Sequence, residues 1–343
     1  METTHIGFPA LTIAVFVGLA LAALLLDMLT HRNNKPITLA GACIWSVFWV
    51  AISLAFAAFL YVRHGAQAAS LFVTGYALEK VLSIDNLFVF MAIFTWFKVP
   101  NGLRHRVLYW GIIGAIVCRA AFVAIGTGLL SFGPFVELAF AAIVMWTAVM
   151  MLKGGDRDDA DQDYSQHLAY RFAKRLFPVW PELYGRRFFV SGKTLAMQAQ
   201  KFAPGMGRGA RRGMLATPLF LCLVVVEVSD ILFAFDSVPA VIAVSREPLI
   251  VYSAMLFAIL GLRTLYFVLE ALKRYLVHLE KAVVVLLLFI AAKLALNATD
   301  ELFRHGINID PNTSLLIVLA VLSIGTLASV AFPKKEVAQA NHP

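Results

Sequence analysis

Charged residues are scarce in this chain. They make up 15% of its 343 residues, whereas about a quarter of the residues in a typical soluble domain are charged. Hydrophobic residues supply 60%, and the mean hydropathy is +0.79. This balance excludes an ordinary soluble domain and predicts a polytopic membrane protein.

Ligands for soft metal ions are scarce as well. Cys43, Cys118 and Cys222 are solitary and form no CxxC pair, so the sequence indicates neither a disulfide framework nor a thiolate metal site. All eight histidines fall in loops, in tails or at the edges of apolar segments. No imidazole is therefore expected at the middle of a membrane, which argues against a zinc carrier.

Long apolar runs dominate the sequence instead. A helix of about twenty apolar residues crosses a hydrocarbon core of roughly 30 Å. Nine such segments can be read, and they predict an all-α polytopic membrane protein with about nine transmembrane helices. The predicted spans are 8–30, 39–62, 69–97, 106–128, 132–152, 216–244, 249–271, 279–298 and 313–332.

The basic residues of the loops indicate the orientation. With the N-terminus outside, the outer loops hold only Arg63, Arg246 and Arg304, while the inner loops hold twenty basic residues. Because basic residues collect on the cytoplasmic side, we expect a multi-pass protein of the inner membrane with its N-terminus outside and its C-terminus in the cytoplasm. The net charge of +8 then attracts anionic lipid, and no nucleic-acid partner is expected.

Two of the apolar segments contain a polar island, "EKVLSIDNLFVF" in the third span and "VVVEVSDILFAFDSVPAV" in the sixth. An ionised side chain at the bilayer centre costs at least about 2.5 kcal/mol on insertion scales, so several in one helix indicate a function. Oxygen donors of this kind suit hard divalent cations such as Mn²⁺, Mg²⁺ and Ca²⁺. The predicted metal ligands are Glu79, Asp85, Asn86, Glu227, Asp230, Asp236 and Ser237.

The two islands also align with each other. Glu79 and Asp230 each precede an aspartate by six positions, and a small polar residue follows that aspartate in both copies. The next span holds an arginine in its interior in each case, Arg119 and Arg263. Two three-helix repeats are therefore predicted at 69–153 and 216–298, and the orientation makes them inverted. Inverted repeats with interrupted helices at the midplane are typical of secondary transporters.

Helical geometry adds an expectation about the backbone. On a continuous helix, Asp85 and Asp236 lie off the stripe of the acids six positions before them. A local unwinding would aim all the ligands at one ion, and Pro239 favours it because proline lacks a backbone donor. We therefore expect broken or kinked third and sixth helices, with breaks around 83–86 and 236–239.

Basic residues within the spans balance the acids. Arg119, Arg263 and Lys293 are expected to be supporting counter-ions, while Lys80 suits pairing with a neighbouring helix as well as it suits transport. Asp27 is a candidate for a cytoplasmic entrance, with snorkelling to the interface as an equal alternative. Five core acids and these four basic residues sum to −1 when all are ionised, so a divalent cation entering in exchange for protons is chemically reasonable.

The domain organisation follows from these spans. Within the long connection, the β-prone FFV before SGK predicts the start of a short β-hairpin. The predicted parts are two N-terminal helices (1–68), the first repeat (69–153), a cytoplasmic loop subdomain (154–215), the second repeat (216–298), and a ninth helix with a cytoplasmic tail (299–343).

The two islands and the "LFAILGLRTLYFVL" that follows them resemble the TerC family of integral membrane proteins. The similarity is greatest to its Alx-type branch, which also has the "RRFFV…ATPL" segment, and it extends from about residue 8 to 332. Members of that family are linked to manganese export, alkaline-induced expression and tellurite resistance. The resemblance implies Mn²⁺ as the transported ion, and the family motif is intact at the seven island residues and at Pro239.

The combined expectation is a secondary transporter, not an enzyme, that exports Mn²⁺ from the cytosol and is coupled to proton entry. Its partners are lipid, Mn²⁺ and protons, with no resident cofactor and an undetermined oligomeric state. The alternatives are a scaffold or assembly factor that docks through the long loop, a cation channel selective for Ca²⁺ or Mg²⁺, and an intramembrane hydrolase. The hydrolase is disfavoured because neither Asp85 nor Asp236 lies beside a GxGD-type signature.

Overall fold

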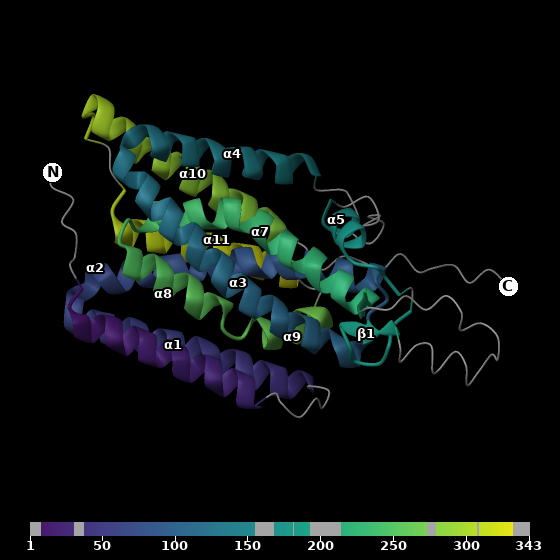
Figure 1. Cartoon of the computed structure of the whole chain (residues 1–343). Helices are drawn as coiled ribbons and strands as arrows, with labels where there is room; N and C mark the ends of the chain where they lie inside the picture. Colours follow the sequence, from purple (N-terminus) through teal and green to yellow (C-terminus); the bar gives the residue numbers. More distant parts are fainter. Residues whose placement is uncertain are drawn as a thin grey trace, which may run out of the picture. The chain divides into compact units, whose positions relative to one another are not determined.

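The computed structural model describes residues 8–30, 38–154, 168–180, 182–192, 214–272, 279–306 and 309–331. These residues form helices almost throughout, with one pair of short strands (Figure 1). The helices are α1 (Ala10–Thr30), α2 (Leu39–Trp96), α3 (Asn101–Leu129), the 3₁₀ turn η1 (Leu130–Phe132), α4 (Pro134–Gly154), α5 (Leu168–Leu176), α7 (Pro218–Val244), α8 (Pro248–Ile259), α9 (Leu262–Leu272), α10 (Leu279–Phe303) and α11 (Pro311–Ala331).

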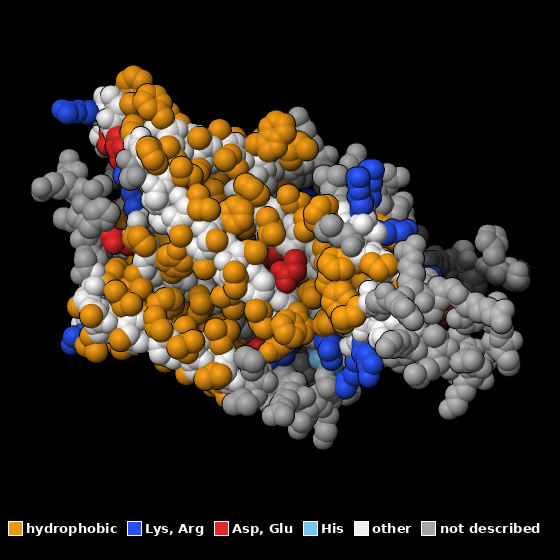
Figure 2. All heavy atoms as spheres, viewed as in Figure 1, with side chains coloured by type: hydrophobic (Ala, Val, Ile, Leu, Met, Phe, Trp, Pro, Cys, Tyr) orange, Lys and Arg blue, Asp and Glu red, His pale blue; other side chains and the backbone are white. Residues whose placement is uncertain are grey.

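The helices have the length and composition of membrane spans. In the described part of the chain, seven are long and apolar enough to cross a bilayer, or eight if the bent pair α8 and α9 counts as one span. Large apolar side chains are exposed along them, among them Val62, Trp146 and Leu316, and hydrophobic side chains cover most of the face shown in Figure 2. The predicted all-α polytopic membrane protein is thus confirmed at this level.

Helix α2 is a hairpin of two helical arms. Its 58 residues are interrupted at Gly65, whose φ of 85° and ψ of 178° lie outside the helical region. The rings of Phe56 and Phe72 lie 5.1 Å apart, whereas sixteen residues of straight helix would separate them by about 24 Å. The chain therefore turns back at Gly65, and only glycine adopts this backbone conformation without strain.

The chain divides into two compact units. The first comprises Met1–Leu87, Ile116–Arg157 and Phe233–Pro343, and the second comprises Phe88–Ala115 and Asp158–Leu232. In the first unit α4 runs alongside α10 (Figure 1), and α10 also contacts α11. An aromatic cluster fills its core, where the ring of Phe257 from α8 lies 5.0 Å from that of Phe56 and 6.0 Å from that of Phe72.

The second unit contains the strand pair. Strand β1 (Phe189–Ser191) pairs antiparallel with β2 (Met214–Ala216), which immediately precedes α7. The β-prone FFV therefore forms a strand whose partner lies more than twenty residues further along the chain. Phe189 packs against Phe220 of α7 with ring centroids 4.4 Å apart, so the strand pair is attached to the start of that helix.

A second backbone break in the described membrane helices lies between α8 and α9. Helix α8 ends at Ile259, Gly261 has a φ of 79°, and the two helices meet at a bend of 53°. By contrast, α2 is helical through residues 83–86, and α7 is a single helix with Pro239 inside it. The expected local unwinding of the third and sixth spans is therefore wrong, while a kink at Pro239 stays a prediction. A proline removes only one helical hydrogen bond, and transmembrane helices tolerate that loss where neighbouring groups replace the bond.

Candidate cation site

The first polar island forms a buried stripe on the second arm of α2. Glu79, Ser83 and Asn86 follow one another at intervals of four and three residues, which places them on one helix face. Glu79 is 0% exposed, Ser83 is 1% exposed, and Asn86 is 8% exposed. The Ser83 hydroxyl donates to Glu79 Oε1 at 3.4 Å. Asp85 is less buried than these three and belongs to a different face.

An arginine from α3 neutralises Glu79. Arg119 is 2% exposed, and its Nη1 forms an ion pair with Glu79 Oε1. The same nitrogen donates to the hydroxyl of Ser237 on α7 at 3.4 Å. Residues of α2, α3 and α7 thus meet at one carboxylate inside the first unit, and two of them, Glu79 and Ser237, are predicted ligands.

The pair leaves hydrogen-bonding capacity unused. Glu79 Oε2 and Asn86 Nδ2 are both buried, and neither has a hydrogen-bond partner among the residues that the structure describes. A carboxylate has two oxygens with about four lone-pair positions. A buried oxygen without a hydrogen-bond partner raises the free energy of the folded protein. Glu79 Oε2 is therefore the oxygen at which a proton can bind while Oε1 contacts Arg119, or a metal cation once the arginine has moved away.

The second island begins in the second unit. Asp230 is 5% exposed, and Glu227 lies one helical turn before it on α7. The backbone of α3 passes directly beside Glu227, since a methyl group added at Gly114 would overlap its carboxylate. The side chain of Asp236 falls outside the described part of the structure, although its backbone belongs to α7.

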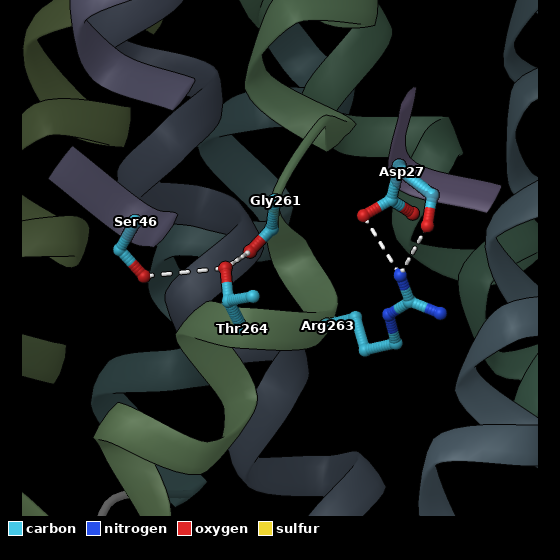
Figure 3. A network of polar contacts seen from close by, with 5 residues as sticks. All are labelled: Asp27, Ser46, Gly261, Arg263 and Thr264. Atoms are coloured by element: carbon cyan, nitrogen blue, oxygen red, sulfur yellow. Dashed lines mark hydrogen bonds and ion pairs between the residues drawn. The ribbon is translucent and has the colours of Figure 1, made fainter. Parts of the chain in front are cut away.

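Arg263 and Asp27 form a separate buried pair in the first unit. Arg263 Nη2 donates to Asp27 Oδ1 at 2.8 Å and to the Asp27 carbonyl at 2.9 Å (Figure 3). In the same view, Thr264 donates to the carbonyl of Gly261 and accepts from Ser46 of the first arm of α2. The arginine proposed as a counter-ion thus neutralises the acid proposed for an entrance.

Lys80 and Lys293 donate hydrogen bonds to neutral groups. Lys293 donates to the hydroxyl of Ser314 on α11 at 2.9 Å. Lys80 donates to the carbonyls of Ala258 and Leu260, at 3.0 and 3.2 Å, where α8 ends. For Lys80 this is the contact with a neighbouring helix that was one of its two predicted roles.

The sequence did not predict an ion network of three residues. Arg246, between α7 and α8, lies 2.5 Å from a carboxylate oxygen of Glu137 on α4 and 2.7 Å from one of Glu301 on α10. Glu137 is 2% exposed, and its Oε2 has no hydrogen-bond partner within the described ranges. The available signal was an acid in the first turn of one span and another in the last turn of a second, but their shared arginine lies in a loop.

The described side chains do not assemble a complete metal site. Among them, no group of three or more His, Cys, Asp and Glu residues lies close enough together to hold an ion. The donors that do converge are the oxygens of Glu79, Ser83 and Ser237, which suit a hard cation. A divalent ion at this point would have to displace Arg119 from Glu79, because the arginine already supplies the positive charge.

The chain is similar to membrane proteins of known family. The model of the integral membrane protein TerC family matches residues 64–337. A tellurium resistance protein TerC from Serratia marcescens is 66% identical over 338 residues, covering 98% of each chain. One of the same name from an Alcaligenes species is 64% identical over 342 residues, covering 99% of each chain.

A more distant relative has a different name. A protein of Photorhabdus laumondii, named as a candidate membrane-bound redox modulator and called Alx, is 36% identical over 291 residues. The match covers 81% of this chain and 84% of the relative, so the Alx-type branch is further away than the proteins named TerC. No solved structure matches the chain. The family match spans most of the sequence and includes both polar islands, and the chain belongs to the TerC family of integral membrane proteins.

Proposed function

We propose that this protein is a secondary transporter that exports Mn²⁺ from the cytosol, coupled to proton entry. The observation that carries the proposal is the Glu79–Arg119 pair, buried between helices of membrane length, in which Glu79 Oε2 has no partner within the described part of the chain. An ionised group in this position is costly unless it is used. Glu79 offers a negative oxygen to an incoming metal cation. After that cation is released, the Arg119 guanidinium takes its place beside Glu79.

The exchange has a direct electrostatic reason. While no metal is bound, Arg119 balances Glu79. A divalent cation at Glu79 repels the guanidinium, which can remain hydrogen-bonded to Ser237. Further carboxylates of the islands, Asp85, Glu227, Asp230 and Asp236, would complete the coordination in a state that brings them together. Protons bound to carboxylates in the empty transporter would leave when the metal arrives.

The proposal includes a topology. The two arms of α2, together with α1, α3, α4, α7, the bent pair α8 and α9, α10 and α11, would give nine crossings. We propose that the N-terminus is outside the inner membrane, that the C-terminus is cytoplasmic, and that the second arm of α2 with α3 and α4 repeats as α7 to α10 in inverted orientation. The excess of basic residues on the inner loops supports this orientation.

Two of the similar proteins are named for tellurium resistance, so tellurite is a second candidate for the transported ion. Tellurite is an oxyanion, and the buried carboxylates of the islands repel anions rather than bind them. Direct transport of tellurite is therefore a poorer fit than cation export, and any resistance would follow from altered metal content. Ca²⁺ and Mg²⁺ are the competing cargoes, because they also prefer oxygen ligands.

Uptake of Mn²⁺ into inside-out vesicles tests the proposal. Native protein should accumulate Mn²⁺ when the vesicle interior is acidic, and Glu79→Gln and Asp236→Asn should abolish accumulation. Asp310→Asn is the matched control, because Asp310 is an exposed acid that precedes α11. Equal uptake by all four proteins would refute a transport role, and uptake indifferent to the pH gradient would refute proton coupling. A scaffold would keep its binding partners in every variant.

A further inference from the structure

The break between α8 and α9 leaves backbone oxygens without helical donors. Helix α8 ends at Ile259, and the amide of Leu260 donates to the Leu256 carbonyl at 3.1 Å. The turn at Gly261 then removes the donor that the carbonyl of Ala258 would find four residues later in a continuous helix. These carbonyls lie at the negative end of the helix dipole, which favours a cation.

The side chain of Lys80 fills this position. Its Nζ lies 3.0 Å from the carbonyl oxygen of Ala258 and 3.2 Å from that of Leu260. An ammonium group can donate three hydrogen bonds, and bonds from a charged donor are stronger than neutral ones. Lys80 lies on the second arm of α2, so the ion at the break is contributed by a different helix.

The surroundings hold the break in its bent form. Trp49 occupies the space beside Gly261, where any side chain at that position would overlap the indole. Thr264 donates to the Gly261 carbonyl at 2.8 Å, and Arg263 is paired with Asp27 (Figure 3). The turn that follows the two carbonyls is thus held by contacts that do not involve Lys80.

We propose that the α8–α9 break is a binding site for a primary ammonium ion, and that the Lys80 side chain is its permanent occupant. Unwound carbonyls of broken helices bind the soluble co-ions of many transporters. Here a tethered ammonium takes the place of such an ion, so the native protein needs no Na⁺ or K⁺ at this position. The proposal concerns a different group from the Mn²⁺ ligands and does not rest on the transport function.

Chemical rescue tests the site. Lys80→Ala removes three methylene groups and the ammonium, which together correspond to n-propylammonium. Both proteins are purified in detergent and measured in choline chloride. Under these conditions Lys80→Ala should melt at a lower temperature than the native protein. Added n-propylammonium should raise it by about 3 °C once the ion reaches tenfold its dissociation constant. Choline and Na⁺ should have no comparable effect, and the native protein should respond to none of these ions.

Lys293→Ala is the matched control. Lys293 is a buried membrane lysine of the same size, but its Nζ donates to the hydroxyl of Ser314 instead of to carbonyls at a helix end. Its loss should lower the melting temperature without rescue by n-propylammonium. Equal rescue of both variants, or rescue of neither, would overturn the proposal. So would a native protein whose melting temperature rises with Na⁺.

Two further variants decide the outcome if Lys80→Ala cannot be purified. Lys80→Gln keeps an N–H donor group near the carbonyls but loses the charge, and Lys80→Arg keeps the charge. We expect Lys80→Arg to melt at a higher temperature than Lys80→Gln. Lys80→Gln with native stability would show that the break does not require a cation, and the proposal would fail.

Discussion

Glu79 is a carboxylate with no contact to water, yet its charge is compensated locally. Arg119 pairs with one of its oxygens, and Ser83 donates to the same oxygen. Such a pair is weak evidence for added stability, because desolvation of the two charges offsets their attraction. Removing one partner, however, leaves the other as a buried charge without compensation. This asymmetry separates the structural role of the pair from its functional role.

Glu79→Gln should lower the free energy of unfolding by about 3–5 kcal/mol, because Arg119 then becomes an uncompensated buried charge. Thermal unfolding of the purified protein measures the loss. The double variant Glu79→Gln with Arg119→Met removes both charges, and it should regain most of the stability while Mn²⁺ flux stays absent. A double variant as unstable as the single one would show that the stranded charge is not the cause.

Asp310 gives a pH-dependent contribution at the start of α11. Its carboxylate accepts hydrogen bonds from the backbone amides of Asn312 and Thr313 and from the Thr313 hydroxyl, and these bonds hold its pKa below the usual value. Because the folded pKa is lowered, the stabilisation is complete above the unfolded pKa near 3.8 and is lost as the pH falls through the folded value. Asp310→Asn should flatten the fall in melting temperature between about pH 5 and pH 2.5; an unchanged acid limb would contradict this assignment.

At the scale of elements, close helix packing positions the second island. Helix α3 approaches α7 so closely at Gly114 that a methyl group would overlap the Glu227 carboxylate. The overlapping atoms are the flexible end of a side chain, so the glutamate can swing aside. A substitution at Gly114 should therefore affect the position of a predicted ligand more than it affects stability.

Gly114→Ala should weaken Mn²⁺ binding or transport while the melting temperature changes little, because only the Glu227 carboxylate has to move. Gly128→Ala is the control on the same helix, since a methyl group there meets no heavy atom within 4 Å. Mn²⁺ flux as a function of concentration distinguishes the two variants. If both keep native affinity, Glu227 does not contribute to the site in its observed position.

The position of the helix break could not be predicted from the sequence. Polar residues and Pro239 suggested breaks within the islands, but both helices continue through them. The actual break is at Gly261, in an apolar stretch where Trp49 lies beside the glycine and Lys80 donates to the preceding carbonyls. Those contacts join residues about 180 to 210 positions apart, and local composition carries no information about them.

The composition of the chain was sufficient to predict the class of protein, and its apolar segments were sufficient to predict most helix positions. The predicted spans 8–30 and 216–244 correspond to α1 (Ala10–Thr30) and α7 (Pro218–Val244). Lipid solvation makes this possible, because each crossing must be a long apolar helix. Partners within the bundle, such as Arg263 with Asp27, could not be predicted, since several charges of either sign were available for pairing.

Orientation can be tested with cysteine labelling. In a chain whose three cysteines are replaced by alanine, Phe303→Cys at the end of α10 should react with an impermeant maleimide in cells with a permeabilised outer membrane. Asn101→Cys at the start of α3 should react only after the inner membrane is opened. Both residues are exposed in the structure. The reverse pattern would place the N-terminus in the cytoplasm and would reverse the proposed direction of export.

The hairpin turn in α2 constrains how the arm that carries Glu79 can move. The two arms are joined through one non-helical residue, Gly65, and are pressed together at Phe56 and Phe72. One residue of extended chain spans only about 3.3–3.6 Å, so the joint has almost no slack. The second arm therefore cannot slide along the first like a piston; it can pivot about the turn. Any motion that carries an ion past Glu79 should be a rocking of this lever, with its largest displacement far from Gly65.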